Sequence, residues 1–179
     1  MGTKLTLEEL KEEIAGLVPD GVRSRRNILT MFADPDKTEA LISCLAEPYR
    51  GKVDYVCAPE SLGLIVGALL ARELGVGFVA VRRNRLFPAP DQDLLTASYI
   101  DHRDQVTTLS TSRKLMKEGG RVLLADDWVE TAATVHSCTN LIEECGCKMI
   151  GVAAIGAEYN SAARDMIDAG IVHCIQLDK

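Results

Sequence analysis

The sequence predicts an α/β fold with a mostly parallel, twisted sheet and helices on both of its faces. Short apolar runs alternate with segments of helical length along the chain, which is typical of a parallel sheet. One of these runs, residues 121–126, ends in two adjacent carboxylates and leads through a short loop into a helical pattern. With 179 residues and no linker or internal repeat, the chain is expected to form one domain, residues 1–179.

Capping residues mark the first two expected helices. Thr6 with Glu9 three residues later is a capping box, which predicts a helix directly after it. Asp34 as N-cap and Pro35 at the first helical position predict a second helix that runs to about Pro48.

The next elements alternate between strand and helix. A short buried strand is expected over residues 53–58, and a helix over residues 61–74. Gly75 follows as a suitable C-cap for this helix. A further strand is expected over residues 77–81.

Residues 82–113 are polar and are interpreted as a long connection. A connection of this length is usually functional or mobile. Residues 97–100 and 106–109 are candidates for two short strands within it. The remaining predicted elements are a helix near 111–117, a strand at 121–126, a helix at 133–145, a strand at 148–155, a small helix at 162–169 and a strand at 171–175.

Composition excludes several classes of function. The formal net charge of −6 argues against a general nucleic-acid-binding protein. The longest apolar stretch, Leu62 to Ala71, is far shorter than the roughly 18 residues that a membrane span needs. The N-terminus carries acidic residues by position 8 and no apolar core of a secretory signal, so a cytoplasmic location is expected.

The six cysteines are expected to be reduced thiols, several of them buried as small apolar side chains. None of them forms a Cys-x-x-Cys pair. A metal site built from Cys145, Cys147, His173 and Cys174 is the alternative, although its spacing matches no zinc signature.

The segment 121–134 carries the strongest indication of chemistry. In an open parallel sheet, ligands bind at the carboxyl ends of the strands, where Asp126 and Asp127 are expected. Paired carboxylates there suit the hydroxyl groups of a sugar, or a metal ion. Thr131, Thr134 and the amino terminus of the next helix favour a phosphate. The alternative is a buried strand end followed by an ordinary capped helix.

Two other strand ends can reach the same edge. Glu60 to Gly63 follow the strand at 53–58, and the alternative is a plain helix start capped by Ser61. Arg82, Arg83 and Arg85 follow the strand at 77–81. Their guanidinium groups can neutralise a polyphosphate, or can form a solvated surface cluster.

The polar stretch itself holds a fourth group of candidates, namely Asp101, His102, Arg103 and Asp104. A mobile loop over the crevice would exclude water during a reaction. The alternative is an exposed hairpin with no role in chemistry.

In this order, the pieces resemble the type I phosphoribosyltransferases, most closely the adenine-specific enzymes, over nearly the whole chain. Residues 121–134 resemble the family's phosphoribosyl pyrophosphate motif, and residues 59–63 resemble its pyrophosphate loop. The basic pair that leads to Leu86-Phe87-Pro88 and the Ala97-Ser98-Tyr99 sequence are also similar to these enzymes.

The resemblance implies a small N-terminal hood, a homodimer and a role for each candidate residue. Asp126 and Asp127 would hold the ribose hydroxyls, and His102 would take part in proton transfer. Mg²⁺ would be bound mainly through substrate oxygens, without dedicated protein ligands. The reaction would transfer ribose 5-phosphate from phosphoribosyl pyrophosphate to a purine-like base. The implied substrate-binding residues are Glu60, Ser61, Leu62, Gly63, Arg82, Arg83, Glu130, Thr131, Ala132, Ala133 and Thr134.

Two departures from the family pattern keep a second function open, and a third, at residues 23–27, concerns the choice of base. The phosphate loop has Ala132-Ala133 where the family usually has Gly-Gly or Gly with a small residue. A left-handed conformation there would cost about 1 kcal/mol or more, whereas a helical one would avoid this cost. His102 stands where adenine enzymes have Glu, and residues 23–27 replace their base-contacting Phe-Arg-Asp. The alternative is a non-catalytic regulatory protein that binds a nucleotide or phosphoribosyl pyrophosphate.

Overall fold

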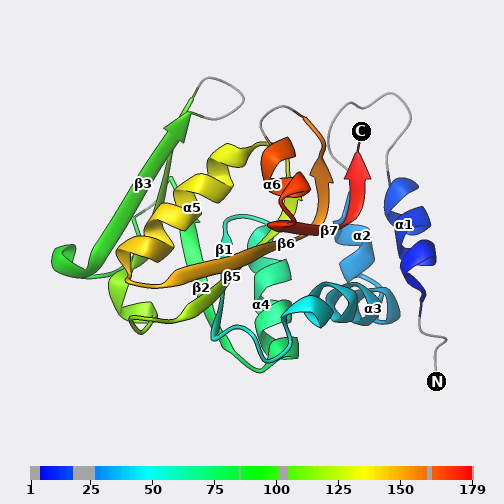
Figure 1. Ribbon diagram of the computed structural model, residues 1–179, viewed down its shortest axis with the longest axis horizontal. Coiled ribbons are helices and arrows are strands. Elements are labelled where there is room, and N and C mark those ends of the chain that lie inside the picture. The colour runs from blue at the N-terminus through cyan, green and yellow to red at the C-terminus, as the bar shows by residue number, and fades with distance from the viewer. Residues whose placement is uncertain (1–4, 18–26, 85, 101–104, 161–162, 179) are drawn as a thin grey trace.

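The computed structural model describes residues 5–17, 27–84, 86–100, 105–160 and 163–178. Within these residues, the strands form one seven-stranded sheet in the order β3-β4-β2-β1-β5-β6-β7 (Figure 1). β1, β2, β5, β6 and β7 run parallel, whereas β3 and β4 pair antiparallel at one edge. The strands are β1 (Tyr55–Pro59), β2 (Gly77–Arg83), β3 (Leu94–Ile100), β4 (Val106–Ser112), β5 (Arg121–Val129), β6 (Lys148–Glu158) and β7 (Val172–Asp178).

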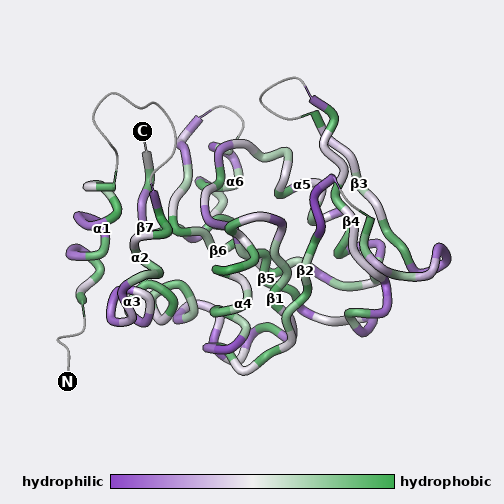
Figure 2. Tube along the Cα trace, turned by 180° about the vertical axis from the view of Figure 1, so that it is seen from behind, coloured by the Kyte–Doolittle hydropathy of each residue, from purple (hydrophilic) through white to green (hydrophobic). Residues whose placement is uncertain are grey.

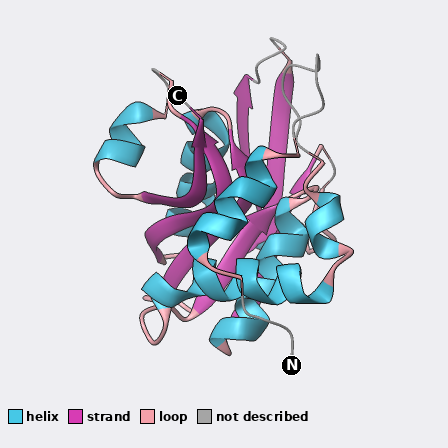
Figure 3. Cartoon of the chain, turned by 90° about the vertical axis from the view of Figure 1, so that its right-hand side faces the viewer, coloured by secondary structure: helices cyan, strands magenta, loops and turns pink. Residues whose placement is uncertain are grey.

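Helices cover both faces of this sheet (Figure 3). One face packs against α5 and α6, and the other packs against α1 to α4. The helices are α1 (Leu7–Ala15), α2 (Leu29–Phe32), α3 (Pro35–Ala46), α4 (Gly63–Leu74), α5 (Ala132–Glu144) and α6 (Arg164–Asp168). Three 3₁₀ turns, η1 (Glu47–Tyr49), η2 (Asp91–Asp93) and η3 (Arg113–Leu115), complete the described elements. The predicted fold class is confirmed.

The central strands are buried on both sides, which explains their nearly continuous apolar sequences. In β5, Val122 and Leu124 join the cluster under α5, whereas Leu123 and Ala125 join the cluster under α3 and α4. All four side chains are at most 1% exposed. Hydrophobic residues accordingly concentrate on the central strands in Figure 2.

Local capping chemistry fixes the helix ends that the sequence predicts. The Thr6 hydroxyl accepts from the backbone N–H of Glu9, and the Glu9 carboxylate accepts from the N–H of Thr6. Asp34 caps α3 through the N–H groups of residues 36 and 37. Gly75 ends α4 in the left-handed conformation, with φ of 71°.

The prediction of a long connection over residues 82–113 is wrong in part. Residues 94–100 and 106–112 form the antiparallel β3–β4 hairpin, in register from Leu94–Ser112 to Ile100–Val106. The predicted helix near 111–117 is also wrong, because β4 continues to Ser112 and only η3 follows. The β-branched Thr and Val residues of this segment favour a strand once a partner strand is available.

An ion pair joins the amino ends of β1 and β5. The Arg121 side chain donates from Nε and Nη2 to the Asp54 carboxylate at 3.0 and 2.9 Å, and the Arg121 backbone N–H donates at 2.9 Å. The Asp54 N–H donates back to the carbonyl of Arg121 at 2.8 Å. These bonds fix the register of two neighbouring parallel strands. The opposite ends of these strands carry the candidate site.

We expect the Asp54–Arg121 pair to make stability depend on acid pH. Hydrogen bonds from the Arg121 side chain, and then from its backbone, lower the pKa of Asp54 from 3.8 to about 2. The pair therefore stabilises the folded state above pH 3.8 and loses this effect as the pH falls toward 2. In denaturant titrations, Asp54→Asn should lower the free energy of unfolding at neutral pH, and its difference from the wild type should shrink toward pH 2.

Asp91→Asn is the matched control, because the Asp91 carboxylate has no ion-pair partner within the described residues. A difference between Asp54→Asn and the wild type that stays constant from neutral pH to pH 2 would contradict the role of the pair.

Candidate active site

Three strand ends meet at the carboxyl edge of the parallel sheet, as the sequence predicts. β1 leads into the amino terminus of α4, and β5 leads into that of α5. Gly63, the first residue of α4, approaches the Asp126 carboxylate of β5 closely. A Cβ atom at residue 63 would lie 2.8 Å from Asp126 Oδ1 and 3.3 Å from Pro59 Cδ. Only glycine therefore leaves the Asp126 carboxylate in this position.

Asp126 is held in an environment that disfavours its charge. Its Oδ1 accepts from the backbone N–H of Asp127 at 2.9 Å. Burial, the neighbouring Asp127 charge and a side-chain hydrogen bond with Asp127 raise the pKa of Asp126 well above 3.8, and the nearby Arg83 guanidinium opposes this shift. A substrate that brings hydroxyl donors or positive charge to this carboxylate would relieve part of the cost.

Glu60 connects the end of β1 to the end of β2. Its Oε2 accepts from the backbone N–H of Arg83 at 2.8 Å, and its Oε1 lies 2.7 Å from Arg82 Nε. The Nε–H of Arg82 is not aimed at a hydrogen-bond acceptor, so the second contact is an ion pair. The Glu60 carboxylate is thus turned toward β2, and it positions the arginine pair.

Arg83 brings an unused donor to the same edge. Its Nε is buried and has no hydrogen-bond partner within the described residues. An unsatisfied buried donor destabilises the folded protein by about 1–3 kcal/mol, and a ligand that accepts from this donor can recover that free energy. The positive charge of the Arg83 guanidinium lowers the pKa of the Asp126 carboxyl and so partly offsets the effect of burial.

The phosphate loop forms a regular helix start. Thr131 is extended, with φ of −137° and ψ of 159°, and α5 begins at Ala132. Among described residues other than glycine, only Asn84 has a positive φ, so neither Ala132 nor Ala133 is left-handed. The methyl groups therefore cause no backbone strain. The helical conformation, which the sequence left as one of two possibilities, is the one observed.

Ser61 is exposed and Leu62 is partly buried, in the turn that joins β1 to α4. Five further candidate residues cannot be placed. His102, together with Arg85, Asp101, Arg103 and Asp104, lies outside the described residues.

Two contacts at this edge carry no signal in the sequence. The Thr134 hydroxyl donates to the Tyr99 hydroxyl at 3.0 Å, which joins the start of α5 to the β3–β4 hairpin. The ring of Trp128, next to the two acids, covers Gly156 of β6, where a Cβ atom would lie 2.1 Å from the ring. Both contacts join residues from different elements, so neither spacing nor composition could reveal them.

The alternative metal site is wrong. No group of three or more His, Cys, Asp or Glu side chains within the described ranges could hold a metal ion. His173 and Cys174 are successive residues of β7, so their side chains point to opposite faces of the sheet. All six cysteines are free. Burial raises the pKa of the Cys57 thiol to about 12, which keeps it protonated.

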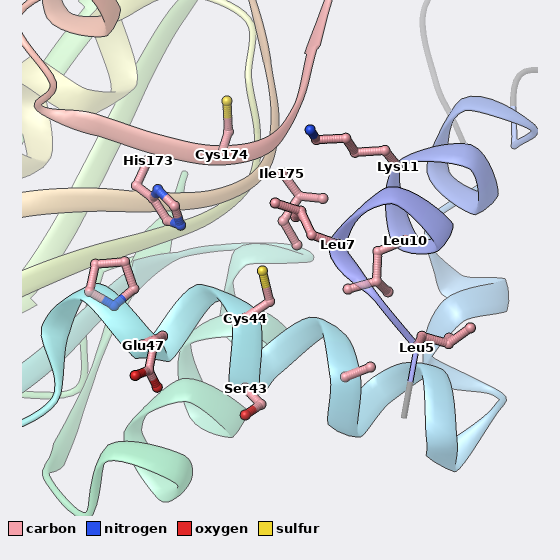
Figure 4. Close-up of a pocket in the computed structure, with 12 residues that line it drawn as sticks. Leu5, Leu7, Leu10, Lys11, Ser43, Cys44, Glu47, His173, Cys174 and Ile175 are labelled. Carbon is pink, nitrogen blue, oxygen red and sulfur yellow. The ribbon is translucent and has the colours of Figure 1, made fainter. Parts of the chain in front are cut away.

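A separate cavity of about 550 Å³ lies between α1, α3 and β7 (Figure 4). Its walls are largely apolar, with Leu7, Leu10 and Ile175 on two sides, and with Lys11 and His173 as polar neighbours. It contains none of the predicted site residues. We therefore place the chemistry at the strand ends and not in this cavity.

Comparison with known proteins agrees with this geometry. A model of the phosphoribosyl transferase domain matches residues 33–179, well over half of the chain. The chain belongs to the phosphoribosyltransferase family. The predicted resemblance and the prediction of a transferase enzyme are thus confirmed. The part of the chain that the structure describes holds no helix long and apolar enough to cross a membrane.

Relatives of this phosphoribosyltransferase include two named adenine phosphoribosyltransferases. That of Brevibacillus brevis is 34% identical over 142 residues, which cover 76% of this chain and 81% of the relative. That of Clostridium botulinum is 30% identical over 175 residues, which cover 95% and 99%. The crystal structure of adenine phosphoribosyltransferase from Thermoanaerobacter pseudethanolicus superposes with a TM-score of 0.82 at 28% identity, covering 96% of this chain and 99% of that one.

The environment of Asp126 predicts that its ionised carboxylate destabilises the folded protein. Because its pKa is raised in the folded state, the wild type should lose stability as the pH rises from 3.8 through the raised pKa. Asp126→Asn removes the charge and retains an oxygen for the Asp127 N–H. We expect a higher free energy of unfolding than in the wild type at neutral pH and a smaller difference near pH 4. Denaturant titration across this range, with Asp91→Asn as control, would contradict the assignment if Asp126→Asn were the less stable protein at pH 7.

The contact between Gly63 and Asp126 makes a second prediction. In Gly63→Ala, the new methyl group must displace the Asp126 carboxylate, and misplacement on this scale should lower kcat/KM by roughly ten- to a hundredfold. Gly16→Ala is the control, since Gly16 is the C-cap of α1 and a Cβ there meets nothing closer than 3.4 Å. Steady-state kinetics would test this, and unchanged kcat/KM in Gly63→Ala would refute the close contact.

Proposed function

We propose that this phosphoribosyltransferase transfers ribose 5-phosphate from phosphoribosyl pyrophosphate to adenine or a closely similar purine and releases pyrophosphate. One observation carries the proposal. The Asp126 carboxylate, the Arg83 guanidinium and the amino termini of α4 and α5 converge at one edge of the sheet. The names of the relatives supply the choice of adenine.

Each part of the sugar phosphate has a chemically suitable partner at this edge. Asp126 and Asp127 are acceptors for the 2′- and 3′-hydroxyls of the ribose. The N–H groups that open α5 have no intrahelical acceptors and carry the positive end of the helix dipole, which suits the 5′-phosphate. The Thr131 hydroxyl adds a further donor, and the Thr134 hydroxyl would become one by turning from Tyr99 to the phosphate.

The charge distribution suits a reaction through a ribose with oxocarbenium character. Negative charge on Asp126 and Asp127 favours a positive sugar ring between them. The unused Nε–H of Arg83 would stabilise charge that develops on the departing pyrophosphate. Glu60 keeps the arginine pair in place, and Ser61 to Gly63 offer the turn that the pyrophosphate would contact. Catalysis would then rest on positioning and electrostatics.

Mg²⁺ fits this site as a partner of the substrate. Mg²⁺ is usually held by one or two carboxylates together with phosphate oxygens. The described residues offer Asp126 and Asp127 but no cluster of three ligands. The pyrophosphate oxygens would therefore supply most of its coordination, and the ion would neutralise the charge of the leaving group.

Trp128 offers a surface for the base. Its indole follows the two acids directly and is only partly buried, while its ring is fixed on Gly156. A base joined to the ribose C1′ would lie near this ring, and offset stacking of aromatic rings is favourable by about 0.5–1.5 kcal/mol. Trp128 is also the single tryptophan of the chain, so its fluorescence reports on this position.

The cellular setting is part of the same proposal. We expect a single domain over residues 1–179, a homodimer, a cytoplasmic location and a role in purine salvage. The free thiols and the formal net charge of −6 support a reducing compartment and a small-molecule substrate more than a nucleic acid or a membrane.

Turnover of a panel of bases tests the proposal. The protein should release pyrophosphate from phosphoribosyl pyrophosphate and Mg²⁺ when adenine is added, and much less with hypoxanthine, guanine or uracil. Asp126→Asn should lower kcat/KM at least about a hundredfold, because it removes an acceptor and a charge at the reacting sugar. Trp128 fluorescence should change on addition of adenine together with pyrophosphate and Mg²⁺.

Binding of phosphoribosyl pyrophosphate without turnover of any base would overturn the proposal and support the regulatory alternative. The absence of strain at Ala132 and Ala133 removes one of the reasons for that alternative. Its remaining support comes from His102, which departs from the family pattern.

A further inference from the structure

Asn160, in the connection between β6 and α6, contacts the phosphate loop from outside its motif. Its side-chain Nδ2 donates to the backbone carbonyl of Glu130 at 2.7 Å, across 30 positions of sequence. Glu130 directly follows β5 and precedes the first turn of α5. The Asn160 side chain thus holds the backbone of the loop to which we assign binding of the 5′-phosphate.

The other end of the Asn160 amide is fixed as well. The side-chain Oδ1 accepts from the backbone N–H of Ala163 at 3.1 Å. The backbone carbonyl of Asn160 accepts from the N–H of Arg164 at 2.9 Å. Since one end of the amide must accept and the other must donate, its orientation follows from its partners. Asn160 therefore accepts hydrogen bonds from the start of α6 and at the same time donates one to the phosphate loop.

This bond sets the direction of one peptide group. The single cis peptide bond of the described residues joins Glu60 and Ser61, so the bond between Glu130 and Thr131 is trans. In a trans peptide, the C=O and the following N–H point in opposite directions. The Glu130 carbonyl points at Asn160, so the N–H of Thr131 points away from it. The N–H groups of Ala132 and Ala133, in the first turn of α5, follow directly in the chain.

We propose that Asn160 is a positioning residue for the 5′-phosphate of the substrate. It turns the peptide between residues 130 and 131 so that the Thr131 N–H joins the donors at the start of α5. This inference rests on the proposed function, because it names what orients the phosphate subsite of that reaction. Without Asn160, this peptide loses the hydrogen bond that orients its carbonyl, and the Thr131 N–H becomes a less preorganised donor for a phosphate monoester.

Asn160→Ser separates the two contacts of Asn160. A serine hydroxyl can still accept from the N–H of Ala163, but it is too short to reach the Glu130 carbonyl. Asn160→Ala loses both contacts. Asn140→Ser is the matched control, because residue 140 is exposed on α5. The affinities of all four proteins for ribose 5-phosphate and for pyrophosphate with Mg²⁺ should be measured by calorimetry, with KM and kcat beside them.

Loss of one preorganised donor should weaken ribose 5-phosphate binding roughly tenfold in Asn160→Ser and Asn160→Ala. Affinity for pyrophosphate should stay within about twofold of the wild type, and KM for phosphoribosyl pyrophosphate should rise more than kcat falls. Asn140→Ser should match the wild type. The melting temperature of Asn160→Ser should stay close to that of the wild type, whereas Asn160→Ala should melt lower.

Unchanged ribose 5-phosphate affinity in Asn160→Ser would overturn the positioning role and leave the proposed function intact. An equal loss of ribose 5-phosphate and pyrophosphate affinity would also overturn it, since it would indicate general damage to the site. A wild type that binds neither ligand would refute the proposed function, and the positioning role with it.

Discussion

The carboxyl ends of β1, β2 and β5 have to meet within hydrogen-bonding reach, and the rest of the structure depends on this constraint. Residues 56–58 of β1 and 122–125 of β5 are apolar and buried on both faces, so no polar side chain within these segments can correct a shift in register. The Asp54–Arg121 pair fixes β1 against β5 at their amino ends. At the other ends, Gly63 touches the Asp126 carboxylate and Glu60 holds the arginine pair of β2. A fold with two covered faces thus concentrates its chemistry at one edge.

The charged groups gathered at this edge destabilise the folded protein, but they suit the binding of a ligand. Asp126 is partly buried beside Asp127, which makes its ionised form unfavourable in the empty site. Arg83 carries a buried donor that has no partner among the described residues. Both groups can be satisfied by one ligand that offers hydroxyl donors to the acids and phosphate oxygens to the arginine. The surrounding core, in which most strand side chains are fully buried, is what keeps these groups in place while the site is empty.

The loops around the site are tied to one another by side chains from distant parts of the chain. Tyr99 of the β3–β4 hairpin bonds Thr134, and Asn160 bonds the carbonyl of Glu130. Trp128 packs on Gly156 of β6. Residues of β3, of β6 and of the β6–α6 connection therefore contact the first turn of α5 or the strand end before it. Precise placement of this turn matters, because an anion bound at a helix terminus is recognised through the direction of a few N–H groups.

The sequence by itself determined the fold class and the helix caps, and it predicted the three strand ends at which we propose the chemistry. These features depend on local patterns: Thr6 and Glu9 cap a helix whatever lies beyond it, and an apolar run that leads into two acids indicates the carboxyl end of a strand. The length of the β3–β4 hairpin was underestimated, because its two strands are stabilised by pairing with each other, which the residues of one strand do not reveal. Only the tertiary structure decided that Ala132 and Ala133 are helical, that Glu60 faces β2 and that Asn160 reaches the phosphate loop. Each of these depends on contacts between residues far apart in the chain, where neither spacing nor composition carries a signal.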